Sequence, residues 1–258
     1  MKFTIMTRKD DYSRRLKEQI ARTLILDYDE VEDNEHPELI ICIGGDGTIL
    51  RAIQKYKDEL SHVAFVAIHT GTLGFFTDYT KEDIDEFLHD IHTNKPVLEA
   101  CPLVEAVLDT GERFLALNEI RIGSFRSTVH YDLFVDGEYF ESVSSCGICV
   151  CTQAGSTGAN RALNGAVVES GLEVLELTQI MPVEHKNQHS LISPCIFKKD
   201  RTILVSGDSL QESILCYDYA ESEKLKGVSS VKIRLSKQSV LFARFRPYSY
   251  LKRLKNLY

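Results

Sequence analysis

The sequence has no apolar run that approaches the roughly 18 residues of a membrane-spanning helix. Its first residues, MKFTIMTRKDDYSRR, turn charged from Arg8, so they do not form a secretory signal peptide. Internal repeats and low-complexity tracts are also absent. We therefore expect a cytoplasmic protein that does not bind a membrane.

The chain also lacks an excess of basic residues. The chain has 30 Lys and Arg against 38 Asp and Glu, which gives a formal net charge of -8. Nucleic-acid backbones select basic protein surfaces, so we expect no nucleic-acid partner. An anionic small ligand is compatible with this charge where local donors or a metal ion neutralise it.

The sequence also lacks a complete set of zinc ligands. It has seven cysteines, and Cys146, Cys149 and Cys151 stand close together. A structural zinc site needs a second pair of ligands at a defined spacing, and no such pair exists here. We expect reduced thiols that pack as small apolar side chains, and no metal ion bound by the protein itself.

What is present is enough for a substantial core: 258 residues, of which 43% are apolar. Over residues 1–96, strand patterns alternate with helix patterns. This order predicts an α/β domain with a parallel, Rossmann-like sheet. The expected strands cover residues 2–7, 39–43 and 62–68; helices are expected after a cap at Ser13 (with Leu16, Ile20 and Leu24 inward), after Asp46, and after the capping pair Thr80 and Asp83.

The pattern changes after Asn94-Lys95-Pro96. Period-two alternation then dominates, and Asp136-Gly137 predicts the turn of a β-hairpin. We expect residues 97–258 to form a β-rich, β-sandwich-like domain with a helical insert near residues 156–180. The tail, from about residue 244, is expected to pack back on the N-terminal domain.

This C-terminal tail is basic. It carries Arg244, Arg246, Lys252, Arg253 and Lys255 and no acidic residue. Charge runs commonly dock on an oppositely charged surface. The alternative is direct contact with a phosphate ligand, and the sequence leaves both open.

The stretch GGDGT, residues 44–48, follows the fully apolar strand 39–43. Ligands of an open parallel sheet bind beyond the carboxyl ends of its strands, and a helix N-terminus attracts anions. The stretch therefore predicts a phosphate cradle, or else a tight turn in which Asp46 only caps the helix. Its spacing matches neither a P-loop nor G-x-G-x-x-G, because Leu50 stands at the third glycine position of the latter.

Asp46 is the candidate reactive group of this stretch. A carboxylate at a helix N-terminus is stabilised as the anion, so we expect a lowered pKa. Its expected role is to accept a hydrogen bond from a substrate hydroxyl and to take the proton late in phosphoryl transfer.

Six stretches in order resemble the NAD kinases of the ATP-dependent bacterial type. They are GGDGT at 44–48, HTGTLGF at 69–75, ALNEI at 116–120, GSTGAN at 155–160, SPCIF at 193–197 and RFRP at 244–247. The resemblance covers nearly the whole chain. It implies transfer of the γ-phosphoryl group of ATP to the 2′-hydroxyl of the adenosine ribose of NAD, which gives NADP.

The resemblance also implies site residues and partners. Asp46 would engage the 2′-hydroxyl and be the catalytic residue. The phosphate-binding residues would be Gly44, Gly45, Gly47 and Thr48, and the NAD-binding residues would be Phe75, Asn118, Glu119, Thr157 and Asp218. Mg²⁺ or another divalent cation would enter with ATP. A homo-oligomer, either a dimer or a tetramer, is expected.

Three positions depart from the family pattern. Ala159 stands where a tyrosine is usual, Cys146 replaces an aspartate, and Tyr219 replaces a histidine. These departures leave two other functions open. One is a non-catalytic or regulatory nucleotide-binding paralogue, and the other is a related GGDGT kinase that acts on another substrate such as a lipid.

Overall fold

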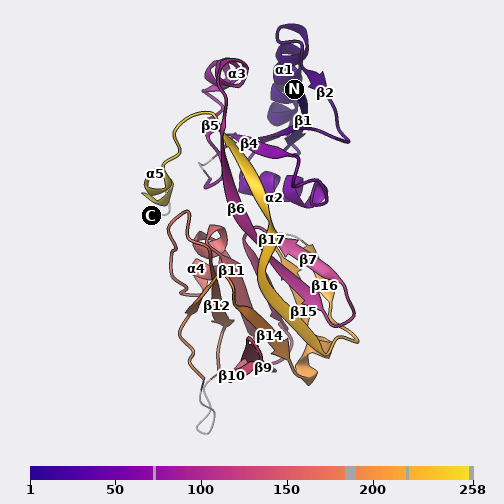
Figure 1. The fold of residues 1–258 in the computed structure, drawn as a ribbon, viewed down its shortest axis with the longest axis vertical. Coiled ribbons are helices and arrows are strands. Elements are labelled where there is room, and N and C mark those ends of the chain that lie inside the picture. Colours follow the sequence, from indigo (N-terminus) through magenta and orange to yellow (C-terminus); the bar gives the residue numbers. More distant parts are fainter. Residues whose placement is uncertain (72–73, 184–189, 219–220, 256–258) are drawn as a thin grey trace. The chain divides into compact units, whose positions relative to one another are not determined.

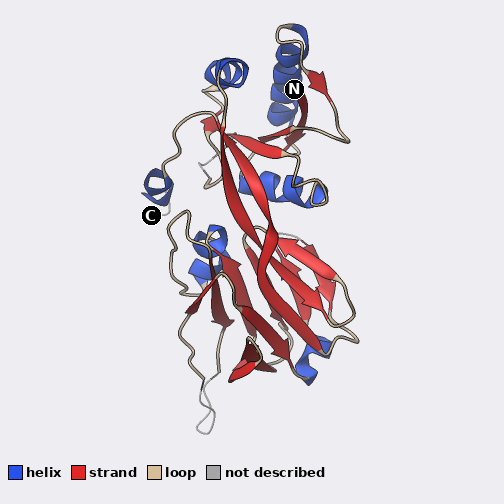
Figure 2. Cartoon of the chain, in the orientation of Figure 1, coloured by secondary structure: helices blue, strands red, loops and turns tan. Residues whose placement is uncertain are grey.

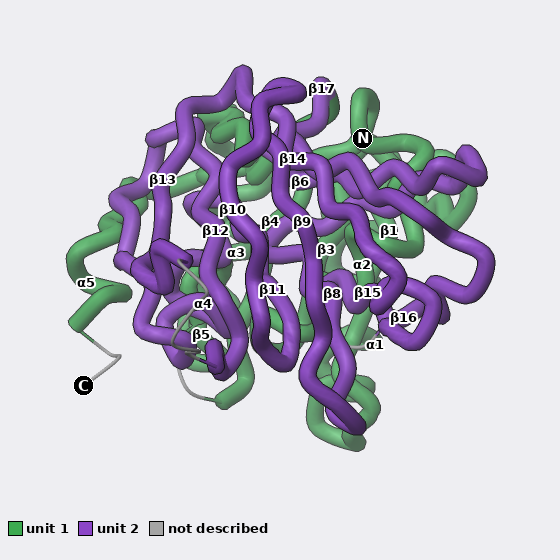
Figure 3. The backbone as a smooth tube through the Cα atoms, turned by 90° about the horizontal axis from the view of Figure 1, so that it is seen from below, with its two compact units in different colours: residues 1–101, 238–258 green, residues 102–237 purple. Residues whose placement is uncertain are grey.

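The computed structural model describes all residues except 72–73, 184–189, 219–220 and 256–258 (Figure 1). The chain forms two compact units, coloured separately in Figure 3. Unit 1 comprises residues 1–101 and 238–258, and unit 2 comprises residues 102–237. The sequence prediction placed the boundary after residue 96 and kept residues 97–258 together. No helix in the described ranges is long and apolar enough to cross a membrane.

Unit 1 contains the predicted parallel sheet covered by helices. Strands β2, β1, β3 and β4 lie side by side and run parallel, and β5 and the end of β17 also pair in parallel with β4. The strands are β1 (Lys2–Thr7), β2 (Val31–Glu32), β3 (Leu39–Ile43), β4 (Ala64–His69) and β5 (Tyr79–Thr80); the helices are α1 (Asp11–Leu26), α2 (Asp46–Lys55), α3 (Ile84–Thr93) and α5 (Tyr250–Leu254).

Helix α1 starts differently from the prediction. Asp10, not Ser13, is the N-cap: its carboxylate accepts a hydrogen bond from the Ser13 backbone N–H at 2.8 Å and from the Ser13 hydroxyl at 2.9 Å. Ser13 therefore lies inside the first turn, because an aspartate three residues earlier satisfies the open N–H groups first. The predicted inward positions Leu16, Ile20 and Leu24 are all buried, as expected.

Strand β3 carries the functional turn to the edge of the sheet. All five of its residues are buried, which confirms that both faces of the strand are covered. Alternate residues Leu39, Ile41 and Ile43 belong to a core that also contains inward residues of α1 and α3. The turn that follows β3 is thus anchored by a strand whose five residues are all buried.

Unit 2 is built almost entirely of antiparallel strands, and Figure 2 shows how few of its residues are helical. One layer has the order β13-β12-β11-β8-β15-β16, and a second contains β10, β9, β14, β17, β6 and β7. Buried residues of both layers form a single core, so the sandwich-like prediction is confirmed. The strands are β6 (Val97–Leu108), β7 (Arg113–Ala116), β8 (Glu119–Gly123), β9 (Val129–Val135), β10 (Glu138–Ser145), β11 (Gly147–Thr152), β12 (Val174–Ile180), β13 (Cys195–Lys198), β14 (Thr202–Ser206), β15 (Ile214–Tyr217), β16 (Glu221–Lys224) and β17 (Ser230–Arg244), of which the first residues of β6 and the last of β17 belong to unit 1.

The predicted hairpin is confirmed, whereas the helical insert is largely wrong. Asp136 and Gly137 have φ values of 53° and 85°, as a tight hairpin turn between β9 and β10 requires. Within the insert, helix is limited to one turn of 3₁₀ helix at Ala154–Thr157, here called η1, and to α4 at Ala159–Ala162. Residues 174–180 form β12 because β11 and β13 pair with it on both sides.

Candidate functional site

The GGDGT turn joins β3 to α2 at the carboxyl edge of the parallel sheet. Gly44 has a φ of 153°, and a Cβ at this position would overlap the Thr48 hydroxyl. The Gly44 N–H donates to the Ile68 carbonyl at 2.9 Å, which ties the turn to the neighbouring strand β4. A cap by Asp46 is not observed: Gly45 is the N-cap, and it makes no side-chain capping bond. The turn must therefore have glycine at position 44, and Asp46 has another role.

The carboxylate of Asp46 is bound by a second loop. It accepts hydrogen bonds from the backbone N–H of Phe75 at 2.9 Å and of Phe76 at 3.3 Å. A Cβ on Gly74 would overlap the Asp46 carboxylate, so only glycine permits this approach. The loop after β4 and the turn after β3 thus form one structure centred on Asp46.

The ionisation of Asp46 differs from the sequence expectation. Burial raises the pKa of Asp46, and this effect outweighs the Phe75 and Phe76 N–H groups and the charges of His69 and Arg253, which lower it. The expected lowered pKa is therefore wrong. The helix terminus stabilises the anion, but the cost of removing a carboxylate from water is larger here.

The phosphate-binding candidates present two kinds of surface. Gly45 and Gly47 have open space where a Cβ would stand, so their backbone is accessible. Thr48 is buried beneath the turn, and its hydroxyl accepts a hydrogen bond from Arg51 Nη2 at 3.2 Å. The turn can therefore offer backbone N–H groups to an anion, while the Thr48 side chain supports it from below.

His69 and the C-terminal segment are parts of this site that the sequence analysis missed. The His69 side chain is buried at the end of β4, and its Nδ1 accepts the Gly71 N–H at 2.8 Å; burial lowers the pKa of this imidazole. The Tyr248 hydroxyl donates to the Phe75 carbonyl at 3.0 Å, and the Phe75 and Tyr250 rings lie 5.9 Å apart. His69 could have been identified from the sequence, because it directly follows the strand expected at residues 62–68. Nothing in the sequence indicated that Tyr248 and Tyr250 contact Phe75.

Two arginines of the tail dock on acidic side chains, as the first of the two interpretations predicted. Arg244 is buried and pairs with Asp78 at 2.8 Å and with Glu99 at 2.7 Å. Arg246 pairs with Asp83 at 3.1 Å and with Glu86 at 3.3 Å. Each guanidinium also lies over an aromatic ring, Arg244 over Tyr248 and Arg246 over Tyr79. These contacts join the tail to the rest of unit 1.

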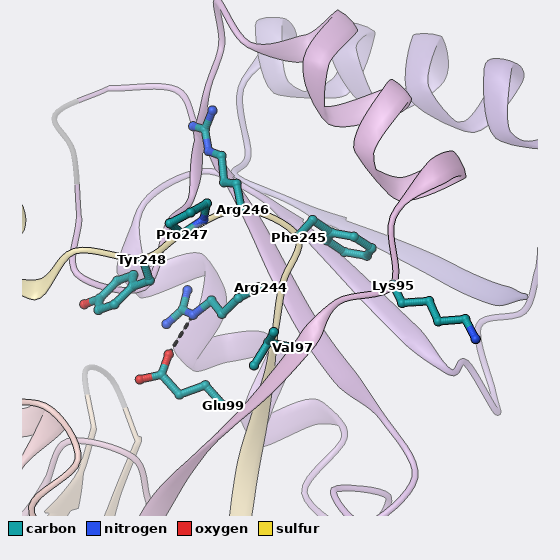
Figure 4. A pocket seen from close by; sticks show the side chains of 8 residues that line it. All are labelled: Lys95, Val97, Glu99, Arg244, Phe245, Arg246, Pro247 and Tyr248. Atoms are coloured by element: carbon teal, nitrogen blue, oxygen red, sulfur yellow. Dashed lines mark hydrogen bonds and ion pairs between the residues drawn. The ribbon is translucent and has the colours of Figure 1, made fainter.

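A cavity of about 470 Å³ lies beside this docked tail (Figure 4). Figure 4 shows the Arg244 guanidinium turned toward Glu99, so this charge is already committed. The cavity is lined by Lys95, Val97, Glu99, Arg244, Phe245, Arg246, Pro247 and Tyr248. None of these residues is among the nucleotide-binding residues expected from the sequence.

The second group of predicted residues lies in unit 2, around the start of β8. The Asp218 carboxylate is buried and accepts the backbone N–H of Leu117 at 3.0 Å and of Asn118 at 2.7 Å. Asp218 itself has a φ of 51°, and its N–H donates to the Glu119 carbonyl. The structure thus brings Asn118, Glu119 and Asp218 together, with Asp218 holding the backbone that presents the other two.

Asn118 and Glu119 have few partners of their own. In the described part of the chain, the Asn118 Oδ1 atom is buried without a hydrogen bond. Glu119 is buried, and its nearest cation is Arg121, whose Nε lies 3.5 Å from Oε1. Burial raises the pKa of Glu119 to about 7, although Arg121 opposes the shift. These two acceptors are suited to donors from a ligand.

Thr157 lies in the η1 turn beside this pair. A Cβ on Gly155 would overlap the Asn118 carbonyl, so glycine at this position lets the loop pack against β8. Gly158 is near Glu119, since a Cβ there would lie 3.8 Å from Oε2. The sequence analysis noted the motif but not this close packing, which places the Thr157 loop next to Asn118 and Glu119.

The two departed positions that the structure describes lie at opposite ends of β11, because Cys146 directly precedes this strand and Ala159 follows η1 beyond its other end. Ala159 is half-buried and begins α4. Cys146 is half-buried between β10 and β11, where its backbone N–H donates to the Ile180 carbonyl and its carbonyl accepts from Ser124. Tyr219 lies outside the described residues. Among the residues that are described, no group of three or more His, Cys, Asp or Glu side chains could hold a metal ion.

Comparisons with known proteins match both units. The family model of the ATP-NAD kinase N-terminal domain matches residues 6–95, and that of the ATP-NAD kinase C-terminal domain matches residues 117–245. An NAD kinase of Staphylococcus aureus (strain JH9) is 35% identical over 260 residues, which cover 98% of this chain and 96% of the relative.

Two solved structures have the same fold. An NAD kinase from Archaeoglobus fulgidus in complex with ATP has a TM-score of 0.80 at 25% identity, covering 100% of this chain and 98% of that one. A yeast NADH kinase complexed with NADH has a TM-score of 0.82 at 17% identity, covering 100% and 86% respectively.

Proposed function

Because this chain belongs to the NAD kinase family, we propose that it transfers the γ-phosphoryl group of ATP to the 2′-hydroxyl of the adenosine ribose of NAD, giving NADP. The observation that carries this proposal is the position of Asp46. Its carboxylate is held by two backbone N–H groups at the edge of a parallel sheet, within a turn that has open space over Gly45 and Gly47. This is a suitable arrangement for a proton acceptor beside a phosphate.

The proposed chemistry assigns one step to Asp46. The 2′-oxygen bonds to the γ-phosphorus, the bond from that phosphorus to the bridging oxygen breaks, and ADP leaves. The hydroxyl proton passes to Asp46. A raised pKa makes Asp46 a better proton acceptor than an ordinary aspartate, because acid–base catalysis improves as the pKa approaches the working pH.

The donor would be ATP complexed with Mg²⁺ or another divalent cation, which neutralises part of the triphosphate charge as substrate. Backbone N–H groups of Gly45 and Gly47 would bind phosphate oxygens, whereas Gly44, whose N–H donates to the Ile68 carbonyl, and Thr48 would keep the turn in shape. Open space over Gly45 and Gly47 supports this assignment.

The acceptor NAD would be bound by the residues that the family resemblance implies. Asn118 and Glu119 would accept hydrogen bonds from a ribose diol; the unpaired Asn118 Oδ1 and the long 3.5 Å ion pair of Glu119 with Arg121 support this. Thr157 would contact the same part of NAD, and Phe75 would help to enclose the adenine. Asp218 would contribute by holding the backbone of Asn118.

The first experiment incubates the purified chain with ATP, Mg²⁺ and NAD, and measures NADP. The departures at Ala159 and Cys146 favour one competing function, a nucleotide-binding paralogue without activity. NAD binding by calorimetry without any NADP would establish that alternative and refute the kinase. Parallel reactions with NADH, and with polyphosphate in place of ATP, identify the acceptor and the donor.

The second experiment tests Asp46. Asp46→Asn removes the proton acceptor and turns an NH₂ toward one of the two N–H groups that bind the carboxylate, so NADP formation should fall by roughly 10³-fold or more and stability should fall as well. The affinity for ATP, measured by calorimetry, should remain close to that of the wild type. A variant with full activity would remove Asp46 from the chemistry.

The resemblance also supports a homo-oligomer in the cytoplasm. Light scattering coupled to size-exclusion chromatography would show a mass of two or four chains. A single-chain mass at working concentration would refute this part of the proposal.

A further inference from the structure

Arg253 differs from the other arginines of the C-terminal tail. Its side chain is 11% exposed, yet its closest carboxylate oxygen, Asp78 Oδ1, is 3.8 Å from Nη2. Its Nε atom is buried and has no hydrogen-bond acceptor in the described part of the chain. A guanidinium has five N–H donors, and burying them unpaired costs free energy. Arg253 is therefore a nearly buried cation whose Nε–H has no acceptor among the described residues and whose closest carboxylate oxygen is 3.8 Å away.

Docking of the tail does not account for this arginine. Asp78 is already bound by Arg244 at 2.8 Å, a much closer pair than that with Arg253. The Tyr248 ring centroid is 5.5 Å from the Arg253 guanidinium, near the limit of a cation–π contact. Arg244 and Arg246 hold the tail in place, whereas Arg253 has only weak contacts there.

Arg253 is close to the turn that carries Asp46. Its helix α5 begins with Tyr250, whose ring contacts Phe75, and the Phe75 N–H binds the Asp46 carboxylate. The positive charge of Arg253 is near enough to lower the pKa of both Asp46 and His69. The guanidinium thus stands in the surroundings of Asp46, within the same compact unit.

We propose that Arg253 is a phosphate-binding residue of the Asp46 site, whose guanidinium takes oxygens of the nucleoside triphosphate bound over the GGDGT turn. This inference rests on the proposed function in that it takes a triphosphate as the ligand. The planar fork of an arginine matches two phosphate oxygens at once. The GGDGT turn carries no lysine of its own, as a P-loop does, so a cation from elsewhere in the chain complements it.

The test measures binding of ATP, inorganic tripolyphosphate and adenosine to the full chain by calorimetry. The variants are Arg253→Met, Arg253→Lys and the control Lys252→Met, which removes an exposed cation from the same helix. Arg253→Met should bind tripolyphosphate and ATP at least about 10-fold more weakly, with adenosine unchanged. Arg253→Lys should lie between this variant and the wild type, and Lys252→Met should match the wild type. Where NADP forms, Arg253→Met should raise KM for ATP and leave KM for NAD unchanged.

Two results would overturn the inference. One is wild-type affinity of Arg253→Met for tripolyphosphate; the other is an equal loss for adenosine, which would indicate a merely structural role. Melting curves show whether each variant folds. If Arg253→Met does not fold, Arg253→Lys provides the test. Wild-type affinity of Arg253→Lys for tripolyphosphate would contradict binding of two phosphate oxygens by the arginine fork. If tripolyphosphate binding depends on Arg253 but no NADP forms, the kinase function is refuted and this inference is supported. If NADP forms and Arg253→Met does not change its formation, the kinase function is supported and this inference is refuted.

Discussion

Asp46 in unit 1 and Glu119 in unit 2 are both enclosed carboxylates whose pKa is raised by burial, but their surroundings differ. Asp46 accepts two backbone N–H groups from the loop after β4. Among the described residues Glu119 has no such donors, and the one close cation there is Arg121 at 3.5 Å. A carboxylate that accepts two backbone N–H groups is held in one orientation and keeps lone pairs for a substrate hydroxyl, whereas one without such donors is left to be oriented by its ligand.

The same contrast extends to the motifs around each group. The GGDGT turn keeps every residue of the family pattern, whereas unit 2 departs from it at Ala159, just after η1, and at Cys146, beyond the opposite end of β11. The predictions below test the two regions, from the largest expected effect to the smallest.

Gly74→Ala should have the largest effect, because its Cβ would overlap the Asp46 carboxylate. The φ of Gly74 is not among the positive values, so the effect is steric. Displacing a reacting group by about 1 Å costs roughly 100-fold, and we expect a loss of that order in kcat. Gly71→Ala is the matched control, since a Cβ there has open space. Equal activity of the two variants would show that Gly74 does not position Asp46.

Asp218→Asn tests whether Asp218 holds the backbone or contacts NAD. An asparagine offers one acceptor to two N–H groups and turns an NH₂ toward one of them, so stability should fall by about 2 kcal/mol. Thermal unfolding would measure this loss, and KM for NAD should rise. Asp109→Asn, where an exposed carboxylate accepts the Ser229 N–H, should lose less. A raised KM at unchanged stability would instead indicate direct contact with NAD.

Glu119→Gln tests the carboxylate without donors. Because its pKa is raised to about 7 from the ordinary 4.5, the folded chain holds a proton that the unfolded chain releases. Wild-type stability should therefore fall as pH rises from about 4.5 to about 7, and Glu119→Gln should be more stable by on the order of 2 kcal/mol above that range. Denaturant unfolding at several pH values measures the difference. The same difference at pH 4 would contradict the assignment.

The ionised Glu119 should also favour ribose hydroxyl donors. NAD affinity should therefore rise between about pH 6 and pH 8 in the wild type and stay flat in Glu119→Gln. Calorimetry with NAD measures this dependence. An identical pH profile in both proteins would mean that Glu119 does not bind the ribose.

Ala159→Tyr should have the smallest effect. A ring at this half-buried position can stack on a base for about 0.5–1.5 kcal/mol, which would lower KM for NAD roughly 2- to 10-fold. Ala162→Tyr adds the same ring at an exposed position of α4 and should leave KM unchanged. No change with Ala159→Tyr would mean that another residue already fills the stacking position.

Much of the Asp46 region could be predicted because its signals are local. A buried strand followed by glycines and a helix places Asp46 at the carboxyl edge of a parallel sheet. The raised pKa could not be read in the same way, because it depends on what covers Asp46. The close contact between Gly74 and the Asp46 carboxylate joins two loops. The sequence shows the glycine but not the carboxylate that lies against it.

Contacts between distant residues were the least predictable. Arg244 binds Asp78 across 166 positions and Glu99 across 145. The sequence showed a basic tail with two possible uses, and the structure divides it by residue: Arg244 and Arg246 hold acidic partners, while the Arg253 Nε–H has no acceptor among the described residues. Likewise, Asp218 was expected to bind NAD, but nothing in the sequence showed that its carboxylate binds the backbone before Glu119.

The sequence by itself determined the family, the parallel sheet, the β-rich second unit and the GGDGT turn, since each depends on residue order and short-range periodicity. Only the tertiary structure decided the partners of Asp46, the poor pairing of Glu119 and the different uses of the tail arginines. The physical reason is that burial and hydrogen bonding set the pKa and orientation of a charged group, and both are properties of neighbours brought together by folding.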